Sequence, residues 1–322
     1  MAVWEFRDSR IERCDESSRW AALEVLYRRV PAPLRDRLIV EVLEESARGD
    51  LDLTGLWVAS GRGGRIEGVL FTQELAGRAA AVWAPEISRK WHRSVLATAL
   101  IETALADLKA RGIVLAQAVM DESADPRTSR DLERGGMPRI TELLYLERET
   151  ALPLVMKDRV EFSWTPYCDQ IEDEFRRVLR DTYDKSLDMP ELEGTRGLDE
   201  ILAGYRAAGC YDPGRWRLGR LANEPGAAAI LLLTEIPSRE AWEVMYLGLT
   251  IPARRRGLGL AILRHALDLA QGRARMIELA VDARNHPARR LYESAGFTLR
   301  DRRVVHLAVL GRPAGSSGEF SA

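Results

Sequence analysis

The chain has 322 residues, 46% of them hydrophobic, which is enough for two domains with separate cores. Its formal net charge of −2 gives no general basic surface, which argues against nucleic acid as an electrostatic partner. Three scattered cysteines, Cys14, Cys168 and Cys210, argue against a disulfide framework and indicate a reducing compartment. Because no apolar run approaches membrane-spanning length, we expect a cytoplasmic protein that does not bind a membrane.

Hydrophobic periodicity predicts an order of helices and strands that occurs twice. In the first half, the predicted strands are Val3–Arg7, Leu56–Ser60, Ile66–Gln73, Ala79–Trp83, Ile113–Met120 and Arg139–Glu147, and the predicted helices are Ser17–Arg29, Leu34–Arg48 and Val95–Lys109. In the second half, the predicted strands are Val160–Trp164, Arg215–Leu221, Ala227–Thr234, Trp242–Leu249, Met276–Val281 and Val304–Leu310, with helices at Asp169–Thr182, Leu198–Ala207 and after Gly257. The sequence therefore predicts two copies of one plan.

A glycine-rich turn joins a predicted strand to a predicted helix in the run Thr250 to Ile262, TIPARRRGLGLAI. Gly257 and Gly259 carry no side chain that would keep a ligand away from the backbone. The first amides of the following helix have no acceptor within the helix, so they can point at an anion. Arg254, Arg255 and Arg256 add positive charge beside the turn. These features are typical of a phosphate-binding turn.

The spacing excludes two other phosphate-binding loops. The run lacks the Lys-Ser/Thr pair of a P-loop and the third glycine of a dinucleotide fingerprint. Arg-x-x-Gly-x-Gly remains, and such a turn alone is a weak signal. The apolar strand Met276–Val281 and the segment DARNHPARRLYESAGF after it add further matching positions.

With these segments the chain resembles the GCN5-related N-acetyltransferase (GNAT) superfamily. The acetyl-CoA motif of that superfamily is a strand, Arg/Gln-x-x-Gly-x-Gly/Ala, a helix, a second strand, and Asn-x-x-Ala-x-x-Leu-Tyr with a following Gly-Phe. The last third of the chain matches every position in order, including Asn285, Ala288, Leu291, Tyr292, Gly296 and Phe297. The resemblance implies an α/β (α+β) fold of two tandem GNAT-like domains, each a mixed, mostly antiparallel twisted sheet flanked by helices.

The two halves differ in the residues that carry this motif. The first half has Ser88-Arg89-Lys90-Trp91-His92-Arg93 in place of the glycine turn, and Leu132 in place of Tyr292. We therefore expect a degenerate GNAT-like domain at 1–150, an acetyl-CoA-binding catalytic domain at 151–310 and a disordered tail at 311–322. This pairing resembles the architecture of tandem members of the superfamily such as mycothiol synthase.

The resemblance also implies how the co-substrate acetyl-CoA is bound. In GNAT proteins the strand before the turn separates from its neighbour, and its amides bind the pantetheine and the acetyl carbonyl; those positions are Leu247, Gly248 and Leu249. The turn would hold the pyrophosphate, and we expect contacts from Arg254, Arg255, Arg256, Gly257, Leu258, Gly259 and Leu260. Asn285 would hold the coenzyme from the next helix. The cysteines and histidines lack metal-ligand spacing, so we predict no metal.

Two residues are candidates for the proton transfers. Tyr292 would be the general acid, since the family often uses this tyrosine to protonate the departing thiolate. Glu243 would be the general base; it lies two alternations before Leu247, which predicts that both side chains share one face of the strand. Tyr292 could instead only pack in the core, and Glu243 could be a solvated strand-end residue, with Glu235 as the spare carboxylate.

Three functions remain open. The first is an N-acetyltransferase (EC 2.3.1.-) that transfers acetyl from acetyl-CoA to a primary amine of a small molecule or protein in a ternary complex. The second is a non-catalytic acyl-CoA-binding sensor or interaction protein, and the third is mycothiol-synthase-like acetylation of a small thiol-sugar amine. The acidic stretch from Asp181 to Glu193 could attract a cationic acceptor, but an ordinary charged loop is the preferred explanation. The sequence leaves the acceptor, the acyl chain, the oligomeric state and any ligand of the first domain undetermined.

Overall fold

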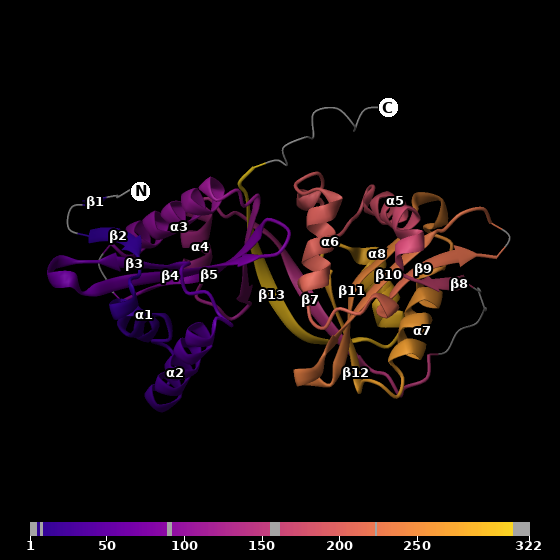
Figure 1. The fold of residues 1–322 in the computed structure, drawn as a ribbon, viewed down its shortest axis with the longest axis horizontal. Coiled ribbons are helices and arrows are strands. Elements are labelled where there is room, and N and C mark those ends of the chain that lie inside the picture. Colours follow the sequence, from indigo (N-terminus) through magenta and orange to yellow (C-terminus); the bar gives the residue numbers. More distant parts are fainter. Residues whose placement is uncertain (1–4, 7–8, 89–91, 155–161, 223, 312–322) are drawn as a thin grey trace. The chain divides into compact units, whose positions relative to one another are not determined.

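The computed structural model describes residues 5–6, 9–88, 92–154, 162–222 and 224–311 (Figure 1). The chain divides into two compact units, the first made of Met1–Ile140 with Val304–Ala322 and the second of Thr141–Arg303. Parts of the predicted strands Val3–Arg7 and Val160–Trp164, and residues 312–322 of the predicted tail, lie outside the described residues. The same holds for 89–91 in the segment that replaces the glycine turn in the first half.

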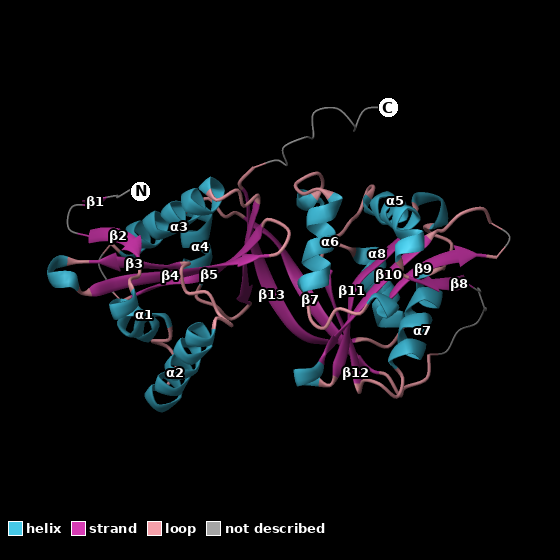
Figure 2. Ribbon diagram, in the orientation of Figure 1, coloured by secondary structure: helices cyan, strands magenta, loops and turns pink. Residues whose placement is uncertain are grey.

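The first unit is a mixed sheet with helices on both faces (Figure 2). Its strand order is β1-β2-β3-β4-β5-β6-β13. The elements are β1 (Glu5–Phe6), β2 (Ser9–Arg13), α1 (Arg19–Leu26), α2 (Ala32–Arg48), β3 (Leu56–Ser60), β4 (Ile66–Leu75), β5 (Ala79–Ile87), α3 (Arg93–Ala110), β6 (Leu115–Asp121), α4 (Pro126–Arg134) and part of β13 (Thr298–Val309). Sequence reasoning missed β2, which pairs with β3 and buries Ile11.

The second unit repeats this plan with the strand order β13-β7-β12-β11-β10-β9-β8. Its elements are β7 (Arg139–Glu149), β8 (Phe162–Pro166), α5 (Glu172–Tyr183), α6 (Leu198–Ala207), β9 (Trp216–Leu221), β10 (Ala229–Ile236), β11 (Ala241–Leu249), α7 (Gly259–Ala270), β12 (Met276–Asp282) and α8 (His286–Ser294). Most neighbouring strands are antiparallel, whereas β11 and β12 are parallel. The predicted fold class is therefore confirmed.

The sheet of the second unit separates two hydrophobic cores. One core lies against α7 and α8 and the other against α5 and α6. Strand β10 is buried on both faces, because Leu231 and Leu233 enter the first core while Ile230 and Leu232 enter the second. This explains why β10 is a continuous apolar run rather than an alternating one.

The register of the strands shows that the two halves are copies. In the first unit β5 pairs in parallel with β6, beginning at Ala79 opposite Leu115, and in the second β11 pairs with β12, beginning at Ala241 opposite Met276. Strands β5 and β11 each have 9 residues, β6 and β12 each have 7, and α4 and α8 each have 9. Counting along α4 places Leu132 where α8 has Tyr292, and Leu132 is fully buried.

The closing strands belong to the opposite units. Most of β7, which comes from the first half of the sequence, lies in the second unit, whereas residues 304–309 of β13 lie in the first. The compact units therefore begin and end at other residues than the domains predicted from sequence. The assignment of 1–150 and 151–310 to separate domains stays a prediction, because compactness reflects contacts rather than ancestry.

Candidate active site

Strand β11 leaves its parallel neighbour halfway along its length. The two strands are paired only from Ala241 opposite Met276 to Val244 opposite Leu279. Beyond that row, β11 continues along β10 as far as Leu249, and β12 continues along β7 as far as Asp282. Among the residues that the structure describes, the edge of β11 that faced β12 therefore pairs with no strand after Val244, which is the separation expected from the GNAT resemblance.

Along β11, successive peptide groups point in turn toward β10 and toward the side from which β12 has separated. The amide of Thr250 donates to the Ala228 carbonyl at 3.0 Å, so it points toward the β10 side of the strand. Because successive peptide groups alternate in an antiparallel pair, the Gly248 amide also faces β10, and those of Leu247 and Leu249 face the open side. In agreement, the Leu249 carbonyl accepts from Arg254 Nε at 3.0 Å.

A β-bulge in β11 places the Glu243 side chain on a different face of the strand from the one expected. Leu233 pairs with Val244 and Leu232 pairs with Tyr246, so Met245 is an extra residue. An extra residue shifts the alternation by one, so Leu247 contacts the core beneath α7 and α8, whereas Tyr246 contacts the core beneath α5 and α6. Glu243 lies opposite Thr234, on the same side as Leu232 and Tyr246. The expectation that Glu243 and Leu247 share a face is therefore wrong.

The turn before α7 presents a row of unpaired amides. The amides of Ala253 and Arg254 bond to the carbonyls of Thr250 and Ile251, and the amide of Ala261 bonds to Leu258. Between them, no backbone N–H from Arg255 to Leu260 donates to another residue in the described part of the chain. Left-handed backbone at Arg255 (φ 60°) and Gly257 (φ 75°) allows neighbouring amides to converge. Together with the positive end of α7, this geometry suits an anion.

Three glycines of the site are required for different structural reasons. A Cβ on Gly257 would meet nothing within 4 Å, so this position needs glycine for its left-handed backbone and leaves the turn open to a ligand. A Cβ on Gly259 would lie 2.6 Å from Leu291 Cδ2, so this glycine lets α7 and α8 pack closely. A Cβ on Gly248 would lie 2.7 Å from Thr182 Cβ, so this glycine brings α5 against β11.

The three arginines of the turn have different surroundings. The Arg254 guanidinium donates to the backbone carbonyls of Leu249, Lys185 and Thr182 at 3.0, 3.2 and 2.9 Å, so it ties the turn to the end of α5. Arg256 pairs with Glu224 at the surface. Arg255 is exposed and, among the described residues, forms no ion pair or hydrogen bond through its side chain. Of the three side chains, Arg255 is therefore the one free to meet a phosphate.

Asn285 and Asp188 join α8 to the loop after α5. Asn285 caps α8, since its Oδ1 accepts from the Ala288 amide at 3.2 Å, and its side chain also hydrogen-bonds to Asp188. Asp188 accepts from the Asp282 amide at 2.9 Å. Burial raises the pKa of Asp188, an effect that these hydrogen bonds oppose. Asn285 thus has a structural role, and its contact with the coenzyme stays a prediction.

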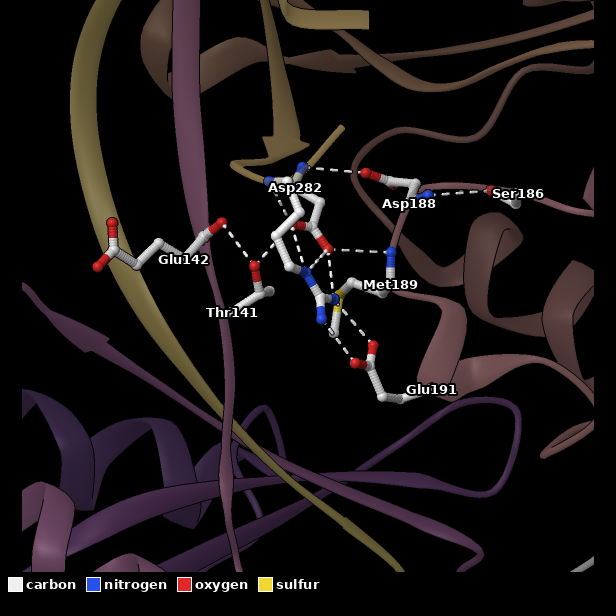
Figure 3. A network of polar contacts seen from close by, with 8 residues as sticks. Thr141, Glu142, Ser186, Asp188, Met189, Glu191 and Asp282 are labelled. Atoms are coloured by element: carbon white, nitrogen blue, oxygen red, sulfur yellow. Dashed lines mark hydrogen bonds and ion pairs between the residues drawn. The ribbon is translucent and has the colours of Figure 1, made fainter. Parts of the chain in front are cut away.

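A polar network holds that loop at the end of β12 (Figure 3). Asp282 is fully buried and accepts from Thr141 Oγ1 at 2.6 Å and from the Met189 amide at 3.2 Å. The Arg284 guanidinium bridges Asp282 and Glu191, with its Nη2 2.7 Å from the Asp282 carboxylate and 2.9 Å from that of Glu191. The acidic loop is therefore engaged in internal contacts.

Tyr292 is buried in α8, 8% exposed, with its ring edge-on to Phe297 at 5.9 Å. Its hydroxyl forms no hydrogen bond with another described residue. Burial, followed by the charge of Asp188, raises the pKa of Tyr292, so the phenol keeps its proton at neutral pH. The ring packs in the core, as one alternative held, and the hydroxyl carries the proton that a general acid would need.

Glu243 and Glu278 face each other across β11 and β12. Glu278 is ion-paired with Arg239 at 2.7 Å and Arg300 at 3.5 Å, whereas Glu243 has no ion pair or hydrogen bond to its carboxylate in the described ranges. Burial, and then the charge of Glu278, raise the pKa of Glu243. A partly buried carboxylate of raised pKa without a partner is suited to accept a proton. The spare candidate, Glu235, is paired with Arg215.

The segment that contains the turn, α7, β12 and α8 is similar to known acetyltransferases. Residues 188–297 match the profile of the acetyltransferase (GNAT) family. This match covers 110 of the 322 residues. Mycothiol acetyltransferase of Beutenbergia cavernae is 37% identical to the chain over 81 residues, which cover 24% of this chain and 27% of that protein. The matched segment is thus about a quarter of the length of that relative.

Two solved structures share the GNAT fold. A GCN5-related N-acetyltransferase from Sphaerobacter thermophilus superposes with a TM-score of 0.60 at 16% identity, covering 95% of this chain and 96% of that one. A GCN5-related glucosamine N-acetyltransferase region of a fungal multi-domain β-N-acetylglucosaminidase gives 0.59 at 14% identity, covering 92% of this chain and 38% of that one. At these identities the likeness concerns the fold alone.

Two histidines of the chain lie in different buried environments. His306 is fully buried and hydrogen-bonded to the Met137 carbonyl and Ser129 Oγ at 2.8 and 2.9 Å, so its ring is satisfied within the core. His265 stacks on Trp164 at 4.5 Å, and burial lowers its pKa to about 4. Neither ring is placed beside Glu243 or Tyr292 by these contacts.

Sequence reasoning did not single out several polar residues of the second unit. Glu278 and Asp282 lie in a strand read as apolar, and Tyr145 lies in a strand that sequence reasoning placed in the other domain. Side chains alternate along a strand, so the sequence already placed Glu278 and Asp282 on one face of β12, and this pattern could have identified them. In the described ranges, no cluster of His, Cys, Asp and Glu is arranged to hold a metal. Every helix in those ranges falls short of what crossing a bilayer requires.

Proposed function

We propose that this protein is an N-acetyltransferase that moves the acetyl group of acetyl-CoA to a primary amine by direct attack in a ternary complex. One observation carries the proposal: the unpaired amides from Arg255 to Leu260 lie at the start of α7, directly after the strand that separates from β12. An anion site beside an open strand edge fits a long ligand with a diphosphate at one end.

The residues present fit acetyl-CoA. The amides of the turn would bind the diphosphate, and Arg255 would add a charge contact. The open Leu247 and Leu249 peptide groups would hold the pantetheine arm, and the Leu247 amide would donate to the thioester carbonyl. Acetyl-CoA supplies the activated acetyl group.

The proton transfers fall to two side chains on opposite faces of the sheet. Glu243 would take a proton from the acceptor ammonium, directly or through water, so that the neutral amine attacks the thioester carbonyl. The Tyr292 hydroxyl would give its proton to the departing thiolate. The bulge at Met245 allows this division, because it turns Leu247 toward α8 while Glu243 stays on the opposite face.

Calorimetry with coenzyme A and acetyl-CoA tests the binding step. We expect micromolar affinity for both, and we expect it to weaken when salt is raised, since part of the contact is ionic. Absence of measurable heat with either compound would overturn the proposal at its foundation.

An acceptor screen that follows release of free coenzyme A tests the chemistry. Glu243→Gln should lower turnover by about 10²- to 10⁴-fold while coenzyme A affinity is unchanged. The matched control is Glu240→Gln, because Glu240 is exposed and precedes the same strand. A protein that binds acetyl-CoA but shows no turnover with any amine, in wild type or variant, would be the non-catalytic sensor.

The similarity to mycothiol acetyltransferase favours a second candidate, acetylation of a small thiol-sugar amine. It concerns 81 residues, so it bears on the motif region rather than on the acceptor. An assay with the glucosamine-inositol thiol precursor distinguishes the candidates: turnover well above that of simple amines supports this acceptor, and its absence removes it.

A further inference from the structure

Strand β7 brings residues of the first half of the sequence to the second unit. It pairs antiparallel with β12, placing Glu147 opposite Glu278, Tyr145 opposite Ala280 and Leu143 opposite Asp282. Leu144 and Leu146 enter the core beneath α7 and α8, so Tyr145 and Glu147 point to the other face. That is the face on which Glu278 and its neighbour Glu243 lie.

Ala280 lies at the point where β11 and β12 separate. The last paired row is Val244 opposite Leu279, so Ala280 is the first residue of β12 beyond it. Because side chains alternate, Ala280 shares the face of Glu278 and Glu243. Ala280 is partly exposed, and its methyl group is smaller than the side chains of Glu243 and Tyr145 on the flanking strands. The two flanking strands are about two strand spacings apart, roughly 10 Å.

The groups on either side of Ala280 lack polar partners. Neither the Glu243 carboxylate nor the Tyr145 hydroxyl forms a hydrogen bond with a described residue. The neighbouring charges are paired: Arg300 contacts Glu278 and Glu147, and Arg303 contacts Asp301. Arg300 and Arg303 also lie over the Tyr145 ring, 5.9 and 5.5 Å from its centroid, and hold it in place. Burial raises the pKa of Tyr145, and the charge of Glu243 raises it further.

We propose that the acceptor lies over Ala280, with its amine at Glu243 and a hydroxyl group hydrogen-bonded to Tyr145, so that the enzyme acts on small amino alcohols. A carboxylate attracts the ammonium group, and a phenol without a partner favours a ligand that supplies one. This inference rests on the proposed acetyltransferase function. It also gives the degenerate half a role, since that half contributes Tyr145 to the site.

The first unit lacks this arrangement at the corresponding positions. Equal register places Ala81 where β11 has Glu243, and Val119 where β12 has Ala280. The first unit thus has neither the carboxylate nor the small alanine side chain at these positions. Ala280→Val copies the residue of the first unit into the second and should fill the acceptor position.

The test compares two amines of equal carbon skeleton, 2-amino-1,3-propanediol and isopropylamine, as acceptors for the full chain. We expect wild type to favour the diol by at least tenfold in kcat/KM. Tyr145→Phe should abolish most of that preference, and Ala280→Val should lower kcat/KM for both amines at least tenfold. Neither change should alter coenzyme A affinity. Val119→Ala, at the matching position of the first unit, should change nothing.

The outcomes separate this inference from the proposed function. Unchanged preference in Tyr145→Phe, or unchanged turnover in Ala280→Val, would overturn the placement, and no turnover or no preference in wild type would overturn the acceptor class. Failure of coenzyme A to bind would instead remove the proposed function. Coenzyme A affinity also reports folding, and Tyr145→Phe, which only removes a hydroxyl, keeps the test decisive if Ala280→Val misfolds.

Discussion

Glu243 lies directly opposite Glu278 in the parallel pair of β11 and β12, and only Glu278 has arginine partners. Arg239 and Arg300 neutralise Glu278, which is 6% exposed, and leave the Glu243 carboxylate as the open one. The pair combines a structural carboxylate with a carboxylate available for proton transfer. Its position in the last rows before β11 and β12 separate places the unpaired Glu243 carboxylate near the open strand edge.

Glu278→Gln should move the acid limb of the kcat/KM profile to lower pH. Burial and the Glu278 charge both raise the pKa of Glu243. Removing that charge lowers this pKa, so Glu243 stays ionised, and able to accept a proton, in more acidic solution. The measurement is kcat/KM from about pH 5 to 8, with Glu240→Gln as control. A limb that stays in place or moves upward would count against Glu243 as the base.

Tyr292→Phe should reduce turnover without loosening the fold. The hydroxyl forms no hydrogen bond with a described residue, so its removal should change the free energy of unfolding by no more than about 0.5 kcal/mol. Turnover should fall by about tenfold or more, since the thiolate loses its proton donor, while coenzyme A affinity is kept. Exposed Tyr211 supplies the control variant Tyr211→Phe. Full turnover in Tyr292→Phe would leave the tyrosine as a packing residue.

Arg254→Ala should lower the stability of the fold, whereas Arg255→Ala should weaken coenzyme A binding. Arg254 donates to three carbonyls, so its loss should cost about 2 kcal/mol of unfolding free energy, measured by denaturant titration. Arg255 is exposed and forms no ion pair or hydrogen bond with a described residue through its side chain, so its loss should leave stability within about 0.5 kcal/mol and weaken coenzyme A binding in low salt. Equal stability of the two variants would contradict the anchoring role of Arg254.

Arg284→Ala should release the loop that contains Glu191. Burial alone would raise the pKa of Asp282, but hydrogen bonds from Arg284, Thr141 and the backbone bring it below its usual value. The corresponding stability is present above the unfolded pKa of about 4 and is lost as pH falls through the folded one. The variant should therefore be less stable at pH 7, differ less from wild type at pH 3, and be cleaved faster in this loop by protease. Equal cleavage rates would show that other contacts hold the loop.

Sequence reasoning was strongest where the signal is local. Leu56–Ser60 and Leu198–Ala207 were predicted to the residue, because apolar periodicity and flanking turn residues determine such elements within one window. The sequence also indicated the glycine turn, the two strands around it and the position of Leu132. Strand β2 was missed, since its burial depends on pairing with β3, more than 40 residues away by sequence number.

Sequence alone indicated the resemblance to the GNAT superfamily, the duplicated plan and the turn whose amides lack partners, because glycine spacing, apolar periodicity and helix starts depend on neighbours along the chain. Only the tertiary structure decided which face Glu243 occupies, because the bulge at Met245 arises from pairing with β10. It also decided that Arg254 anchors α5 and that Tyr145 reaches the second unit. Contacts between distant segments form in the folded chain, and no local pattern records them.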